Sequence, residues 1–210
     1  MPRKEAVAAQ DGQPSWLAPG EPLPVRLMNT IWADRHGVHD ALTTRGHLSE
    51  WFRIVGLSTE PIALTEAELN TARRLRDALR RLGALLTEDS RPAAAVTDDL
   101  GAAVRQVNSV ASAGPGHRLR LGDGVLVRDT APSGRSARAA LAAVATEAID
   151  VLTGPDAQLL RACYAPGCVI YFMKDHPRRE WCSTTCGNRA RAARHYARRI
   201  EGRRRAAHPG

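Results

Sequence analysis

Cys163-Tyr-Ala-Pro-Gly-Cys168 and Trp181-Cys182-Ser-Thr-Thr-Cys186-Gly187-Asn188-Arg189 are the stretches that organise this chain of 210 residues. They hold all four of its cysteines in two pairs, C-x4-C and C-x3-C, with thirteen residues between the pairs. Zn²⁺ binds four thiolates tetrahedrally, and each short pair can supply two neighbouring corners. In a cytosolic chain such spacing favours metal or redox chemistry over the alternative of two disulfides. The spacing therefore predicts one structural zinc ion on Cys163, Cys168, Cys182 and Cys186.

The residues around the two cysteine pairs predict a small module. Tyr164 to Gly167 has the composition of a turn, and residues 169–173 are typical of a short strand. Cys186 is expected at the start of a helix, where backbone N–H groups and the helix dipole stabilise a thiolate. His176 is the rival ligand, but four cysteines already close a structural site. We expect a knuckle, a short hairpin and a helix that carries the last ligand.

The helix that begins near Cys186 is predicted to have two different sides, at about 100° per residue. The arc expected to face the metal and the core holds Cys186, Ala190, Ala193, Ala197 and Ile200. A separate basic arc holds Arg191, Arg194 and Arg198, bordered by Asn188, His195 and Arg199. The residues predicted to bind DNA are Arg189, Arg191, Arg194, His195, Arg198, Arg199, Arg203 and Arg204. For Asn188, a structural role within the module and a role in DNA recognition are equally open. Arg189 is expected to pack or to contact phosphate rather than to read bases.

Positive charge is concentrated at the end of the chain that carries the cysteines. The formal net charge is +8, and residues 161–210 contain 12 Lys or Arg against 3 Asp or Glu. Residues 1–160 contain 18 against 19. Two of the basic residues are lysines and the rest are arginines, a bias that a GC-rich genome can produce but that cannot place the excess at one end. The asymmetry predicts a nucleic-acid-binding end on a neutral body.

Length and hydropathy limit the class of protein. A chain of this length suffices for one ordinary domain and a small module. No apolar run approaches the ~20 residues that cross a bilayer, and residues 1–16 lack the apolar centre of a signal peptide. We expect a cytoplasmic protein that associates with the nucleoid and not with a membrane.

The region before the cysteines predicts a mainly α body with one small β-hairpin, an α+β domain. Residues 1–24 contain five prolines without periodicity, which is typical of a flexible leader. Apolar periodicity and capping residues predict helices over 25–32, from Thr43 or Thr44 to 55, over 65–87 with a Thr65–Glu68 capping box, from Thr97 to 113, and over 136–152. Alternation around Gly-Asp-Gly predicts a hairpin over 119–127, the one strong strand signal of this region.

Domain boundaries follow from these elements. Gly154-Pro155-Asp156 is expected to be a hinge or short linker, so that 25–154 form the helical domain, 155–205 the zinc module with its basic helix, and 206–210 a tail. Trp51 is expected to anchor the core of the helical domain. The polar side of the 65–87 helix is expected to be solvated, and it carries Arg73, Arg74, Arg76, Arg80 and Arg81.

The tetrapeptide Cys186-Gly187-Asn188-Arg189, preceded by Trp181-Cys182 and a C-x4-C pair, resembles the CGNR zinc finger. The preceding region resembles the ABATE domain that usually accompanies this finger, through Asn29-Thr30, Asp40, Leu42, Leu48, Trp51 and Gly56. Together the two resemblances cover about residues 25–205. They imply a bacterial, stress-induced transcription regulator that binds DNA through the finger. The interval between Cys182 and Cys186 differs by a residue among relatives, which concerns the shape of the loop.

These observations predict a zinc-dependent DNA-binding protein that is not an enzyme, because no nucleophile–base pair, phosphate loop or paired carboxylates stand out. The alternatives are a zinc-stapled module that binds a protein or RNA. The helical domain is expected to sense a small-molecule effector or to form a homodimer. A polar cluster between two predicted helices is the candidate effector pocket, with capping and turn roles as the alternative, and it consists of Asn29, Arg35, His36, His39 and Asp40.

Overall fold

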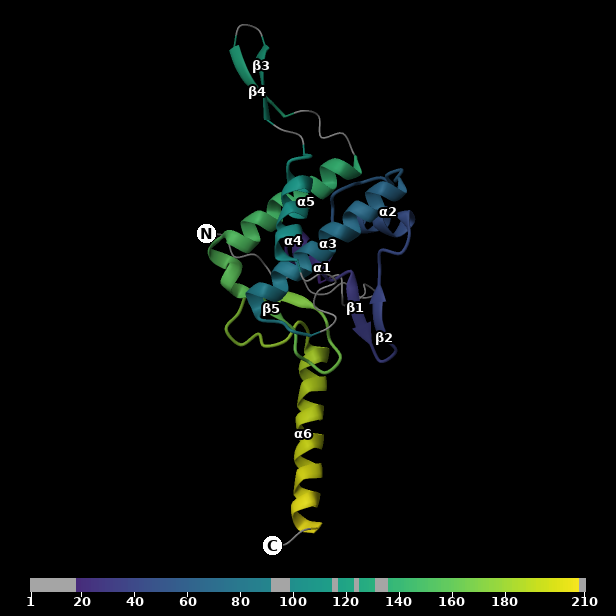
Figure 1. Ribbon diagram of the computed structural model, residues 1–210, viewed down its shortest axis with the longest axis vertical. Helices are drawn as coiled ribbons and strands as arrows, with labels where there is room; N and C mark the ends of the chain where they lie inside the picture. The colour runs from purple at the N-terminus through teal and green to yellow at the C-terminus, as the bar shows by residue number, and fades with distance from the viewer. Residues whose placement is uncertain (1–17, 92–98, 115–116, 123–124, 131–135, 208–210) are drawn as a thin grey trace.

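A computed structural model describes residues 18–91, 99–114, 117–122, 125–130 and 136–207. The helices are α1 (Leu23–Met28), α2 (Arg45–Ile54), α3 (Glu66–Thr87), α4 (Leu100–Ala111), α5 (Ala137–Thr153), a 3-10 helix (Pro155–Leu159) and α6 (Thr184–Ala207). The strands are β1 (Ile31–Asp34), β2 (Gly37–Asp40), β3 (His117–Gly122), β4 (Val125–Thr130), β5 (Leu160–Ala162) and β6 (Tyr171–Met173). They pair as three antiparallel two-stranded hairpins. The mainly α fold with small hairpins is confirmed (Figure 1).

Helix α3 is the centre of the helical body. It begins at a capping box, in which the Thr65 side chain accepts from the Glu68 N–H and the Glu68 carboxylate accepts from the Thr65 N–H at 2.8 Å. Leu69, Leu75 and Leu79 lie on its buried side, against α1, α2, α4 and α5. Trp51 of α2 packs in the same core with 2% of its surface exposed, so its predicted role as an anchor is confirmed.

Two arginines of α3 are buried, and their expected solvation is wrong. Arg80 is 1% exposed and donates to the carbonyl oxygens of Met28 and Val169 at 3.0 and 3.3 Å. Arg76 is 4% exposed and donates to Asp40 at 2.6 Å and to Asp77 at 3.0 Å. A guanidinium tolerates burial when its N–H groups meet carboxylates and carbonyls. Helical periodicity alone does not reveal such partners.

A hairpin replaces the second half of the first predicted helix. Helix α1 ends at Met28, and Trp32 lies on β1, where it pairs with His39 of β2 and stacks on its ring at a centroid distance of 4.4 Å. Gly37 has φ +127°, a conformation that favours glycine in the turn. The period-3.6 spacing of Leu27 and Ile31 was misleading, because cross-strand pairs stabilise these four-residue strands only in the folded chain.

The other predicted elements lie close to their expected bounds. Helix α2 is capped by Thr44, and α5 by Ser136. Asp99 caps α4, since its carboxylate accepts from the Ala102 N–H at 2.9 Å. The β3–β4 pairing confirms the predicted hairpin. The predicted leader up to residue 17, the Thr97 cap, the Asp123-Gly124 turn and the tail from residue 208 lie outside the described residues.

The β5–β6 hairpin connects the helical body to the cysteine-containing module. Leu160, Ala162 and Tyr171 belong to the main apolar core, whereas Phe172 belongs to a second cluster around the cysteines. A 3-10 helix over Pro155–Leu159 stands where a hinge was expected. The hairpin therefore contributes side chains to both clusters, while Arg161 in the middle of β5 is exposed. Within the described ranges, no helix combines the length and the apolar character needed to cross a membrane.

The Asn29 amide, directly after α1, links the end of this helix to β6. Its Nδ2 donates to the Tyr171 carbonyl at 2.9 Å, and its Oδ1 accepts from the Tyr171 N–H at 2.9 Å. Asn29 has no exposed surface, so both backbone groups are satisfied away from water. The amide side chain thereby makes the two hydrogen bonds to Tyr171 that a neighbouring strand would make.

We predict that Asn29→Ala lowers the free energy of unfolding by about 3 kcal/mol, because it leaves a buried N–H and a buried C=O unpaired. Chemical denaturation of the zinc-loaded protein measures the change. Asn108→Ala, on the exposed side of α4, is the matched control and should change the free energy by less than about 0.5 kcal/mol. Equal effects in the two variants would contradict the assigned role of Asn29.

Candidate metal centre and basic helix

The four cysteine sulfurs converge on one point. All four Sγ atoms lie within 4.8 Å of one another, with Cys168–Cys182 at 3.8 Å and Cys182–Cys186 at 3.4 Å. Four thiolates around one Zn²⁺ at about 2.3 Å would stand about 3.8 Å apart. Cys163, Cys168 and Cys186 are buried, so the donor set is closed to further ligands. The arrangement fits one structural Zn²⁺, and it confirms the four predicted ligands as the donor set.

Short backbone turns bring the sulfurs together. Cys163 N–H donates to the Ile170 carbonyl and Cys168 N–H to the Ala165 carbonyl, both at 2.9 Å, which closes the first knuckle. Gly167 has φ +72°, so the knuckle turns through a conformation that glycine adopts without strain. Cys186 lies in the first turn of α6, where its N–H donates to the Ser183 hydroxyl at 3.2 Å. The expected place of Cys186 at a helix start is confirmed.

The pKa values of the four neighbouring thiols shift in opposite directions, two downward and two upward. The pKa of Cys163 is lowered to about 7, because its sulfur accepts hydrogen bonds from the Cys168 and Cys182 thiols. The pKa of Cys186 is lowered because its sulfur accepts from the thiols of Cys163, Cys168 and Cys182. The pKa values of Cys168 and Cys182 are raised, since their thiols donate within the cluster. A bound Zn²⁺ takes the place of these shared protons and holds all four sulfurs as thiolates.

His176 lies apart from the sulfurs. Its Nδ1 accepts from the Arg178 N–H at 3.1 Å, within an exposed turn after β6. It is not among the groups that surround the metal position. The four-cysteine set is thus favoured over a set that includes this histidine.

Each residue of the CGNR tetrapeptide has its own structural role. Cys186 supplies a ligand, and Gly187 lies against the Trp181 indole, whose Cδ1 would stand 3.1 Å from an added Cβ. The Asn188 Oδ1 accepts a short hydrogen bond from Arg191. Arg189 donates through Nη2 to the Cys186 sulfur at 3.1 Å. Asn188 is thus seen holding a basic side chain of α6.

Arg189 lies on the metal-facing side of α6. Its guanidinium is partly buried, and its Nε atom is buried without a partner among the described atoms. A cation beside a zinc-bound thiolate offsets part of the negative charge that four thiolates leave on one Zn²⁺. The predicted packing role of this residue agrees with its position, whereas its place among the DNA-contacting residues remains a prediction.

A charged pair from the helical body holds the first knuckle. Arg91 donates through Nη1 to the carbonyl oxygens of Cys163 at 2.7 Å and Cys168 at 2.5 Å. The Asp89 carboxylate receives two hydrogen bonds from the same guanidinium, at 2.7 and 2.8 Å, and one from the Tyr171 hydroxyl at 3.0 Å. Burial acts to raise the pKa of Asp89, but the hydrogen bonds from Arg91 outweigh it and hold that pKa below its usual range. The pair therefore stays ionised at neutral pH.

Glu21 makes a second link of this kind. Its carboxylate accepts from the Met173 N–H at 2.8 Å and pairs with Arg179 at 2.7 Å. Burial raises the pKa of Glu21, while Met173 and Arg179 oppose the shift. Neither link has a sequence signal, because Glu21 lies in a proline-rich segment and Asp89 and Arg91 lie in an aperiodic loop. Only the folded chain brings them to the cysteines.

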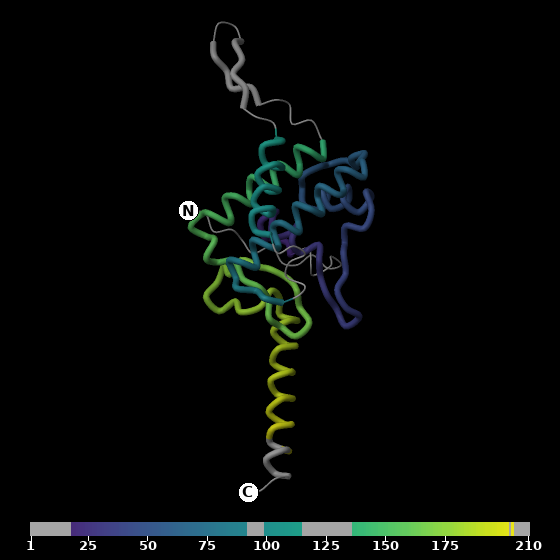
Figure 2. The backbone as a smooth tube through the Cα atoms, viewed as in Figure 1, coloured from purple at the N-terminus to yellow at the C-terminus, as the bar shows by residue number. Residues whose placement is uncertain are grey.

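The basic helix α6 runs away from the rest of the described chain (Figures 1 and 2). The exposed predicted DNA-binding residues are Arg191, Arg194, His195, Arg198, Arg199 and Arg203. Arg194 lies over the Trp181 ring at 5.8 Å. The side chains of Arg204 and Arg205 lie outside the described residues, although the helix continues through them.

One side of α6 differs from its prediction. Cys186 and Ala190 are buried as expected, but Ala193 and Ala197 are exposed and Ile200 is only half-buried. The expectation that the whole arc packs against the module is wrong, because the last fully buried residue of the arc is Ala190, about one turn after Cys186. Beyond that point neighbouring arginines and alanines alike face solvent.

The five residues of the predicted effector pocket make separate structural contacts. Asn29 is buried against Tyr171, and Asp40 accepts from Arg76 and from the Leu42 N–H. Arg35, His36 and His39 lie on the β1–β2 hairpin, where the Asp34 carboxylate accepts from the His36 N–H and bonds to the His39 ring. Neither cavity described below is lined by any of the five.

Comparison with protein families agrees with this architecture. Residues 21–155 match the model of the ABATE family, described as a "putative stress-induced transcription regulator". The chain belongs to the ABATE family. Residues 160–199 match the model of the CGNR zinc finger, so the ABATE domain is followed by the finger that the four cysteines indicate. No curated protein matches the chain.

We predict that Arg189→Gln weakens zinc binding by about tenfold, because it removes the hydrogen bond and the positive charge beside the Cys186 thiolate. Competition with a chromophoric chelator measures the affinity, and metal analysis should find one zinc per wild-type chain. Arg191→Gln is the matched control two residues farther along α6, since Arg191 hydrogen-bonds to Asn188 and not to a cysteine in the described structure. A zinc affinity that falls equally in both variants would contradict the assignment.

Proposed function

We propose that this ABATE–CGNR protein regulates transcription by binding DNA through α6. The observation that carries the proposal is a long helix that is anchored at the metal centre and whose five arginines between residues 191 and 203 are exposed. The final 50 residues carry 12 Lys or Arg against 3 Asp or Glu, and much of this excess lies on α6. The charge is thus concentrated on the part of the chain that extends farthest from the body (Figure 1).

The dimensions of α6 suit the major groove of B-DNA. The exposed segment from Arg191 to Arg199 spans about 12 Å of helix axis at about 1.5 Å per residue. A major groove about 12 Å wide admits one α-helix, with side chains on both flanks within reach of phosphates. The exposed alanines between the arginines permit close approach, and an alanine methyl can contact the methyl group of thymine.

The arginines of α6 fall into different roles in this proposal. Arg191 and Arg194 are oriented near the module, by Asn188 and by the Trp181 ring. A guanidinium held in this way loses less conformational freedom on binding, which suits bidentate contacts to guanine. Arg198, Arg199 and Arg203 lie farther out and suit contacts to phosphate. The four thiolates are structural and carry out no reaction.

The helical body supports α6 rather than contacting DNA in this proposal. Asp89, Arg91 and Glu21 tie the knuckle and β6 to the body, so α6 is aimed by the whole domain. The same body can carry an effector site or a homodimer contact. As a DNA-binding regulator, the protein would act in the cytoplasm at the nucleoid.

We predict that Arg194→Ala combined with Arg198→Ala weakens DNA binding and reduces its salt dependence. Loss of the base contact of Arg194 would lower the affinity, and loss of the phosphate contact of Arg198 would make the slope of log K against log salt less steep by about 0.9. Fluorescence anisotropy with duplex DNA selected from a random pool measures both quantities. Arg74→Ala with Arg138→Ala is the matched control, because it removes the same charge from exposed sites on α3 and α5.

Three outcomes separate the proposal from its alternatives. An unchanged affinity and slope in the α6 variant, or an equal loss in the control, would contradict the role of α6. Tighter binding to duplex RNA than to duplex DNA would favour the RNA alternative, although the deep and narrow major groove of A-form RNA disfavours entry of a helix. A protein that co-purifies while nucleic acid is not retained would favour a protein-binding module.

A further inference from the structure

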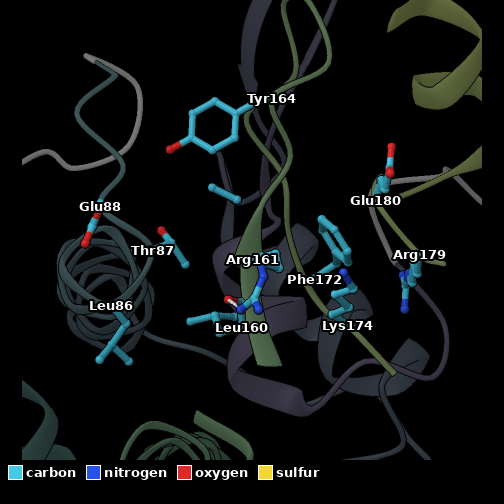
Figure 3. Close-up of a pocket in the computed structure, with 11 residues that line it drawn as sticks. Leu86, Thr87, Glu88, Leu160, Arg161, Tyr164, Phe172, Lys174, Arg179 and Glu180 are labelled. Atoms are coloured by element: carbon cyan, nitrogen blue, oxygen red, sulfur yellow. Dashed lines mark hydrogen bonds between the residues drawn. The ribbon is translucent and has the colours of Figure 1, made fainter. Parts of the chain in front are cut away.

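A cavity of about 400 Å³ lies where the end of α3 meets the β5–β6 hairpin. Leu86, Thr87 and Glu88 form its wall on the helical body (Figure 3). Arg161, Phe172 and Lys174 face them from the two strands and the residue after β6. The cavity is therefore shared between the ABATE domain and the finger.

Two cations on the hairpin side of the cavity, Arg161 and Lys174, have no carboxylate partner within the described part of the chain. Lys174 is half-buried, and Arg161 is held by hydrogen bonds to the carbonyl oxygens of Gln158 at 2.5 Å and Leu160 at 2.7 Å. Arg179 also lines the cavity, but it pairs with Glu21 and Asp175. The combination of Arg161 and Lys174 therefore favours an anionic group.

Carboxylates also line the cavity, at a distance from this pair. Glu88 and Glu180 are exposed and lie at its two sides in Figure 3, with Arg161 and Lys174 between them. They limit the anion to the middle of the cavity. A compact group such as one carboxylate fits this distribution of charge.

A second, apolar hollow of about 250 Å³ adjoins the first. It lies among α3, α4 and α5, and Leu82, Val107 and Leu152 line its inner part. Leu85, Val104 and Ile149 also line it, although 52%, 46% and 37% of their surfaces are exposed. Leu86 lines both hollows, so the cationic cavity and the apolar groove meet at this side chain.

We propose that the two hollows together bind an amphiphilic carboxylate with an unbranched alkyl chain. Its carboxylate lies between Arg161 and Lys174, and its chain crosses Leu86 into the groove among α3, α4 and α5. Burial of the exposed leucine, valine and isoleucine surface supplies the affinity, and the two cations set the direction of the chain. A small polar anion would leave the groove uncovered, and a neutral chain would leave both cations unpaired.

The position of the carboxylate would connect the ligand to both cysteine pairs. Tyr164, which follows Cys163, and Glu180, which precedes Cys182 by two residues, line the same cavity. Arg91, which holds the first knuckle, lies 4.6 Å from the centre of the Tyr164 ring. A role of the ligand as an effector of DNA binding rests on the proposed function, whereas the binding itself does not.

Calorimetric titration of the full-length zinc-loaded protein tests the proposal with decanoate, butyrate and 1-decanol. We expect decanoate to bind at one molecule per chain. Butyrate should bind at least about a hundredfold more weakly, because each buried methylene tightens binding about fourfold. 1-Decanol should bind about tenfold more weakly than decanoate, since it lacks the charge that meets Arg161 and Lys174.

Variants of the two hollows make the test specific. Arg161→Gln with Lys174→Gln should weaken decanoate about tenfold and leave 1-decanol unchanged, whereas Lys174→Arg alone should retain decanoate binding. Val104→Asp should weaken both ligands. The matched controls are Arg178→Gln and Val38→Asp, which change exposed residues outside both hollows and should change neither affinity.

Several results would overturn the proposal. Equal affinities for butyrate and decanoate would exclude the groove, and equal affinities for decanoate and 1-decanol would exclude the cations. Decanoate binding that resists both sets of variants would place the ligand elsewhere. A dimer that Val104→Asp dissociates, in a protein that does not bind decanoate, would assign the groove to a second copy of the chain. None of these readouts uses DNA, so failure here and failure of the DNA-binding proposal can be told apart.

Discussion

The position of the β5–β6 hairpin between the helical core and the cysteine cluster is the constraint on which the rest of the structure depends. A sheet of only two three-residue strands leaves the backbone groups on its outer edges without a strand partner, and this sheet lies between the helical core and the cysteine cluster. The body therefore supplies partners from its side chains. The Asn29 amide pairs with both backbone groups of Tyr171, Arg80 donates to the Val169 carbonyl, and the Glu21 carboxylate accepts from the Met173 N–H. Each is a buried polar group that is costly without its partner and stable with it.

The metal centre extends this arrangement instead of standing apart from it. Arg91 holds the carbonyl oxygens of two metal ligands, Cys163 and Cys168, and is itself fixed by the buried Asp89. Zinc bound to the sulfurs and Arg91 bound to the carbonyl oxygens would thus constrain the same knuckle. The metal contributes folding energy to the module, and the body limits the directions in which α6 can extend. This coupling explains why a finger of about forty matched residues adjoins a helical domain so closely.

Much of the architecture could be predicted from local signals. The Thr65–Glu68 capping box, the leucine spacing of α3 and the Ser136 cap are satisfied by residues close in sequence, so they specify helices before any packing occurs. The metal ligands were predictable for the same reason, because two short cysteine pairs leave few ways to arrange four thiolates. The β1–β2 hairpin was not predictable, since its stability comes from the Trp32–His39 pair and from packing of Trp32 against the cysteine cluster.

The sequence by itself determined the helix caps, the four-cysteine donor set and the concentration of arginine on the last helix, because each depends on neighbouring residues or on composition. Only the tertiary structure decided which charges are buried. In the sequence, Arg76 and Arg80 resemble solvated helix residues, because their partners, Asp40 and the Val169 carbonyl, belong to distant segments. Only the tertiary structure turned Arg189 toward the Cys186 sulfur and left Ala193 and Ala197 exposed. Helical phase gives the side of a helix on which a residue lies, but what covers that side depends on where the body ends.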